Sequence, residues 1–86
     1  MPTVFIPPQM RDLADVESVE IEGTSIRQVI RALEDQFPGI RLRLCDGDAI
    51  APGLAVSIDG SLSARGLLAP CKPDSEIHFL PGIGGG

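Results

Sequence analysis

The chain has 86 residues, 43% of them apolar, and Phe5, Phe37 and Phe79 are its only large aromatic residues, so we expect one small domain with a core of isoleucine, leucine and valine. The formal net charge of −5 gives no basic surface for a phosphate backbone, which argues against nucleic-acid binding and favours a basic protein partner. No apolar run approaches the ~20 residues of a membrane span, and the opening residues lack the features of a signal peptide, so we expect a cytoplasmic protein that does not bind membranes.

The first part of the chain predicts a β-hairpin with a long loop. Residues 3–6 are a β-branched and aromatic run that Pro7 and Pro8 end. Residues 17–22 alternate between apolar and polar side chains, which is typical of a strand with one buried face. The polar residues 9–15 would connect the two strands.

The strongest pattern in the sequence predicts a helix over residues 26–37. Its apolar side chains recur at the helical period and form one stripe: Ile26, Val29, Ile30, Leu33 and Phe37. Ser25 and Gln28 have the spacing of a capping box, and Thr24 is an equally suitable cap. Pro38 and Gly39 would end the helix.

The second half of the chain predicts further strands. Residues 40–53 fit a short helical or irregular turn followed by a loop, and residues 54–58 alternate as a strand before Asp59-Gly60, a typical hairpin turn. Residues 65–69 would form a short loop or strand, and residues 77–80 a last strand. If the first and last strands are parallel neighbours, the helix crosses one face of a small mixed sheet. This α+β architecture leaves the other sheet face uncovered.

The sequence ends in PGIGGG, at residues 81–86. Glycine loses more conformational freedom on ordering than any other residue, so this segment is poorly suited to a packed element. A thin backbone with a terminal carboxylate could instead enter a narrow active site of another protein, although a frayed chain end is the alternative. We therefore expect a domain over residues 1–80 and a flexible tail over residues 81–86.

The rest of the sequence contains no convincing catalytic or metal site. Asp46 and Asp48 flank a glycine, as in a solvated turn. Cys45 and Cys71 are far apart and belong to no metal-ligand motif, which indicates two separate thiols. His78 has no catalytic partner near it in the sequence. The chain is therefore not expected to be an enzyme.

These features resemble the ubiquitin-like sulfur carriers, which include the small subunit of molybdopterin synthase, the thiamine sulfur carrier and the cysteine-biosynthesis sulfur carrier. The resemblance covers essentially the whole chain, and its motifs are GT before the helix, FPG after it, VSIDG at residues 56–60, PDSEI at 73–77 and FLPGIGGG at 79–86. The family typically has V-x-V-N-G, D-G-D-E-V and F-x-P-P-V-A-G-G in the last three places. Asp59, Gly82 and Gly84 depart from that pattern, whereas Gly85 and Gly86 keep it.

The resemblance implies a β-grasp fold and a carrier role without catalysis by the chain itself. An E1-like activating enzyme would use ATP and Mg²⁺ to adenylate Gly86, and a persulfide would then displace AMP and leave a thiocarboxylate. This group would donate sulfur to an acceptor synthase of molybdopterin, cysteine or thiamine biosynthesis. Gly84 and Gly85 would form the rest of the reactive tail. The carrier would bind no cofactor or metal, would be a monomer when free, and could also be the non-catalytic small subunit of a synthase.

Strand alternation predicts the surface on which such partners would dock. Phe5, His78 and Leu80 would lie on the uncovered sheet face, and with Pro81 they form the expected partner-binding surface. Two other functions remain open. The chain could be a ubiquitin-like protein modifier, in which the activated glycine forms an isopeptide with a lysine, or a binding module with an inert tail.

Overall fold

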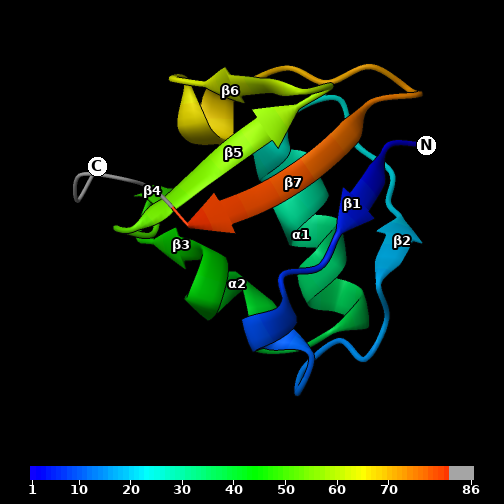
Figure 1. Ribbon diagram of the computed structural model, residues 1–86, viewed down its shortest axis with the longest axis vertical. Helices are drawn as coiled ribbons and strands as arrows, with labels where there is room; N and C mark the ends of the chain where they lie inside the picture. Colours follow the sequence, from blue (N-terminus) through cyan, green and yellow to red (C-terminus); the bar gives the residue numbers. More distant parts are fainter. Residues whose placement is uncertain (82–86) are drawn as a thin grey trace.

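The computed structural model describes residues 1–81, and its centre is a five-stranded mixed sheet (Figure 1). The strands are β1 (Thr3–Phe5), β2 (Ser18–Glu20), β5 (Leu54–Ile58), β6 (Ser61–Ser63) and β7 (Glu76–Pro81), in the spatial order β2-β1-β7-β5-β6. β7 lies between β1, to which it is parallel, and β5, to which it is antiparallel. The predicted parallel pairing of the first and last strands is confirmed.

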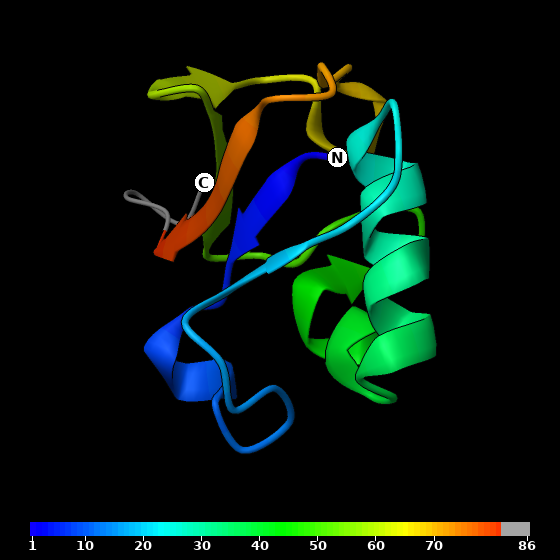
Figure 2. The ribbon, with the colours of Figure 1, turned by 90° about the vertical axis from the view of Figure 1, so that its right-hand side faces the viewer.

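Two helices lie on the same side of this sheet, α1 (Ile26–Gln36) and α2 (Ile40–Leu44) (Figure 2). The predicted capping box starts α1, because Oγ of Ser25 accepts a hydrogen bond of 3.3 Å from the backbone N–H of Gln28. The reciprocal bond comes from the neighbouring residue, since the backbone N–H of Thr24 donates to Oε1 of Gln28 at 2.9 Å. Both predicted cap residues therefore contribute.

The hydrophobic core fills the space between α1 and the facing side of the sheet. The helix contributes the predicted stripe, in which Ile26, Val29, Ile30 and Leu33 are all buried. The sheet contributes its alternate side chains, of which these are buried: Val4, Val56, Ile77 and Phe79. The alternation expected from the sequence is confirmed on this face. Among the described residues, no helix is long and apolar enough to cross a membrane.

Three connecting segments differ from their predictions. The loop over residues 9–15 contains a short 3-10 helix, η1 (Pro8–Met10), and buries Met10 and Ala14, so it belongs to the core although most of its residues are polar. The segment after α2 forms a small hairpin of β3 (Cys45–Asp46) and β4 (Ala49–Ile50), where the sequence predicted a loop. Residues 65–69, predicted as a short loop or strand, contain the 3-10 helix η2 (Gly66–Leu68) and no strand.

The predicted hairpin turn at Asp59 and Gly60 joins β5 to β6. Both residues have positive φ angles, 54° and 86°, as the two central positions of a type I′ turn require. This turn pairs Ile58 with Ser61 and Ser57 with Leu62. It therefore decides which side chain of β6 reaches each face of the sheet.

Candidate functional site

The last strand leads directly into the glycine-rich segment. β7 pairs with β1 along its first half and with β5 from Ile77 to Pro81, where Leu54 is the partner of Pro81. Residue 82 therefore follows a backbone that is fixed in the centre of the sheet. The predicted tail residues Gly84, Gly85 and Gly86 lie outside the described residues.

A row of side chains crosses the sheet face that α1 and α2 do not cover. Phe5 and His78 are partners in the parallel pair of β1 and β7, and their rings stack with centroids 4.2 Å apart and an interplanar angle of 3°. On the other side of His78 the row continues through Ser57 of β5 to Leu62 of β6. Leu62 is 70% exposed, so an accessible apolar side chain ends the row.

Leu80 extends this surface towards the end of β7. It is 39% exposed and lies opposite Ala55 of β5, on the same face as Phe5 and His78 because side chains alternate along a strand. We call Phe5, His78, Leu80 and Leu62 the docking face. Three of its members were predicted from the sequence, and Pro81, the fourth predicted partner-binding residue, ends β7.

Leu62 and Ala55 were missed by the sequence analysis, although a signal for them was present. A two-residue turn at Asp59-Gly60 fixes the register of the two strands that it joins. Counting outwards from the turn pairs residue 57 with residue 62, and alternation then assigns both residues to the face of His78. The register of this hairpin would therefore have predicted the exposed leucine.

A hydrogen-bonded carboxylate fixes the start of β7. Oδ1 of Asp59 accepts a bond of 2.8 Å from the backbone N–H of Glu76, and Oδ2 accepts one of 3.0 Å from Oγ of the buried Ser75. The bond from Glu76, followed by that from Ser75, holds the pKa of Asp59 below its usual 3.8. The β5–β6 turn and the beginning of β7 are thus joined by a charged group.

The other polar candidates do not form a catalytic centre. Cys45 is half-buried and Cys71 is buried, and in both cases burial raises the pKa of the thiol, which disfavours the reactive thiolate. His78 stacks on Phe5. No group of three or more histidine, cysteine, aspartate or glutamate residues within residues 1–81 is arranged to hold a metal ion. The docking face and the segment after β7 are therefore the candidate site.

Comparison with known proteins gives both a family and a fold. The ThiS family profile matches residues 4–86. A chain of the Amycolatopsis orientalis BexX/CysO complex is 27% identical with a TM-score of 0.90, and the match covers 100% of both chains. Mycobacterium tuberculosis CysO is 24% identical with a TM-score of 0.87, over 96% of this chain and 100% of that one.

A third similar structure is that of small archaeal modifier protein 1 from Methanosarcina acetivorans. It is 22% identical with a TM-score of 0.77, and the match covers 99% of this chain and 95% of that one. No match was found among curated protein sequences. The three solved structures confirm the predicted β-grasp fold.

Proposed function

Since the chain belongs to the ThiS family of small ubiquitin-like sulfur carriers, we propose that its Gly86 carboxylate is adenylated by an activating enzyme and then converted to a thiocarboxylate. The observation that carries this proposal is that a glycine segment directly follows the strand in the centre of the sheet. The carrier supplies the reacting carboxylate and its partners supply the catalysis.

The chemistry explains why activation must come first. A carboxylate is a poor electrophile, whereas an acyl adenylate has AMP as a good leaving group. The terminal sulfur of a partner's persulfide attacks the carbonyl carbon and releases AMP, which leaves an acyl disulfide. A partner thiolate then attacks the sulfur of this disulfide that does not carry the acyl group. The products are a disulfide on the partner side and a thiocarboxylate on Gly86, which can donate sulfur.

The geometry of β7 explains how the tail would reach an active site. Five residues follow Pro81, and a fully extended segment of that length spans at most about 18 Å. A partner that adenylates Gly86 must therefore bind close to the end of β7. The docking face meets this condition, because Leu80 lies next to that end and is accessible.

Partner binding by a similar protein supports this role for the docking face. The 27% identical match is to a chain in a complex of BexX and CysO. We propose that this chain likewise works in complexes, first with an E1-like activating enzyme that uses ATP and Mg²⁺, and then with an acceptor synthase in cysteine, molybdopterin or thiamine biosynthesis. Each partner would contact the same sheet face in turn.

ATP–pyrophosphate exchange with the activating enzyme tests the proposal. The unaltered chain should support exchange, whereas a chain lacking Gly85 and Gly86, or extended by one residue after Gly86, should not. Cys45→Ser and Cys71→Ser are the matched controls and should retain exchange, because in this mechanism neither thiol takes part in the adenylation of Gly86. Exchange with the extended chain, or its loss in either cysteine variant, would contradict this mechanism.

Intact-mass analysis separates the carrier from the alternative, a protein modifier. After incubation with activating enzyme and a sulfur donor, a carrier gains the mass difference between sulfur and oxygen. A modifier instead forms conjugates with lysine side chains of other proteins. Conjugates without sulfur exchange would support the modifier and contradict the carrier.

A further inference from the structure

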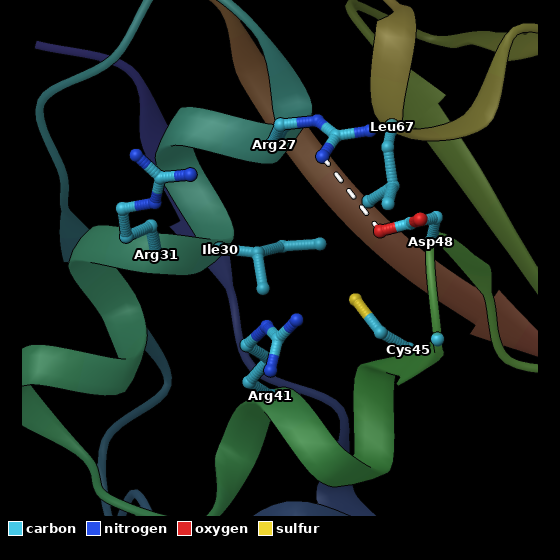
Figure 3. Close-up of a pocket in the computed structure, with 8 residues that line it drawn as sticks. Arg27, Ile30, Arg31, Arg41, Cys45, Asp48 and Leu67 are labelled. Atoms are coloured by element: carbon cyan, nitrogen blue, oxygen red, sulfur yellow. Dashed lines mark ion pairs between the residues drawn. The ribbon is translucent and has the colours of Figure 1, made fainter.

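A pocket of about 120 Å³ lies between α1, α2 and the β3–β4 hairpin (Figure 3). α1 contributes Arg27, Ile30 and Arg31 to its lining, and α2 contributes Arg41. The β3–β4 hairpin contributes Cys45 and Asp48. Ile30 is 2% exposed, so the base of the pocket is apolar while its rim is charged.

The rim concentrates positive charge in an acidic protein. The chain has seven basic side chains against twelve acidic ones, and three of the seven line this pocket. Arg27 and Arg31 are one helical turn apart, where like charges repel each other. All three side chains are exposed, so their guanidinium groups are accessible to a ligand.

Only one of the three arginines has an ion-pair partner among residues 1–81. Nη1 of Arg27 lies 3.9 Å from Oδ1 of Asp48, whose side chain is 91% exposed, so this contact is long and solvated. Glu34 is close enough to Arg41 to be affected by its charge, but the oxygens of Glu34 accept backbone bonds of 2.9 Å from Gly39 and Arg41. The guanidinium groups of Arg31 and Arg41 form no ion pair with any of the residues that the structure describes.

The directions of the side chains show where a ligand would sit. In Figure 3, the guanidinium groups of Arg27 and Arg41 lie on opposite sides of the end of Ile30, while Arg31 points away from Cys45. A guanidinium group is planar and has several N–H donors, with which proteins bind the oxygens of phosphate, sulfate or carboxylate.

We propose that this pocket binds a small oxyanion of the phosphate or sulfate type. Arg27 and Arg41 donate hydrogen bonds to it, Arg31 adds positive potential, and Asp48 competes with the anion for Arg27. The volume suits a free anion or the phosphate group of an ester. This inference does not depend on the carrier chemistry at Gly86, because it rests on a different face of the molecule.

Titration with inorganic phosphate, followed by amide NMR at constant ionic strength with chloride as the balancing anion, tests the site. We expect saturable shifts that cluster at residues 27–31 and 41–48. Arg41→Gln should weaken binding about tenfold, the usual effect of losing a charge-assisted hydrogen bond. Asp48→Asn should strengthen binding, because it removes the competing carboxylate.

Two matched controls separate a site from a general charge effect. Asp46→Asn changes the charge of the same hairpin outside the pocket lining, and Lys72→Gln removes an exposed positive charge elsewhere, so both should leave the affinity unchanged. A parallel titration with AMP shows whether an ester phosphate or the free anion is preferred. Absence of saturable shifts with both probes would overturn the proposal. It would also be overturned if Arg41→Gln bound as well as the unaltered chain, or if Asp46→Asn acted like Asp48→Asn.

Discussion

Gly23 approaches Val29 so closely that a Cβ atom on Gly23 would lie 2.9 Å from Cγ2 of Val29 and 3.0 Å from its backbone nitrogen. The backbone of Gly23 therefore lies against the first turn of α1. The carbonyl oxygen of the same glycine is 3.5 Å from Sγ of Cys71, on the chain that returns towards β7. A glycine at this position brings three segments together.

The first prediction concerns this contact. Gly23→Ala should lower the free energy of unfolding by about 1–3 kcal/mol, because the new methyl group overpacks the space beside Val29. Urea unfolding would measure the loss. In a Val29→Ala background Cγ2 is absent but the backbone nitrogen remains 3.0 Å from the new methyl group, so the same change should cost less without becoming neutral. An equal cost in both backgrounds would show that this contact does not explain the glycine.

The second prediction concerns pH. The folded-state pKa of Asp59 is lowered, so the stability that it contributes is fully present above its unfolded-state pKa and is lost as the pH falls from about 5 through the lower folded value. Asp59→Asn should therefore be less stable than the unaltered chain at pH 7, with a smaller difference at pH 3. Urea unfolding at the two pH values checks this.

Asp74→Asn is the control for that experiment, because Asp74 is an exposed aspartate in the loop that precedes β7. The free energy of unfolding of Asp74→Asn should differ little from that of the unaltered chain at both pH values. If Asp59→Asn showed the same stability difference at pH 7 and pH 3, the hydrogen bonds to Ser75 and Glu76 would not depend on the charge of Asp59.

The third prediction concerns the core. Leu33 is completely buried in the middle of the α1 stripe, so Leu33→Ala should cost about 2–5 kcal/mol through lost burial and the cavity that remains. Leu42, in α2, is 80% exposed, and Leu42→Ala should change stability by less than about 0.5 kcal/mol. Chemical denaturation of both variants tests the assignment, and a loss below about 1 kcal/mol for Leu33→Ala would contradict it.

The fourth prediction concerns docking. Phe5→Asp, Leu80→Asp and Leu62→Asp each place a charge in the docking face. Each should weaken binding to the proposed activating enzyme at least tenfold, as loss of an apolar contact at an interface centre does. Leu68→Asp is the control, because Leu68 is 67% exposed but belongs to η2. Calorimetry with folded variants would measure the affinities. Unchanged affinity for all three face variants would remove this surface from the proposed function.

Long periodic segments of the fold could be predicted from the sequence. α1 and β7 were identified because burial of one face imposes a regular pattern on segments of this length. The region after α1 was ambiguous for a physical reason: Ile40, Leu42 and Leu44 alternate like a strand, but Ile40 and Leu44 also have helical spacing. The structure buries those two and exposes Leu42, which no local rule could decide.

Other features depend on contacts between distant segments. Met10 is buried although its neighbours are mostly polar, because η1 packs against a core made by other elements. β3 and β4 have two residues each and are too short to show a period.

Phe5, His78 and Leu80 could be assigned to one face by alternation. The arginine pocket could not be predicted, since its lining comes from separate elements that only the folded chain brings together.

The place of β7 in the sheet also affects how the protein can be made. β7 joins the β1–β2 hairpin to the β5–β6 hairpin, yet it is the last of the described elements to leave the ribosome. Until it emerges, the two hairpins have no common neighbour and their inner edges stay unpaired, which exposes them to aggregation and proteolysis. The sheet can therefore be completed only after the chain has been translated as far as Pro81, five residues before Gly86.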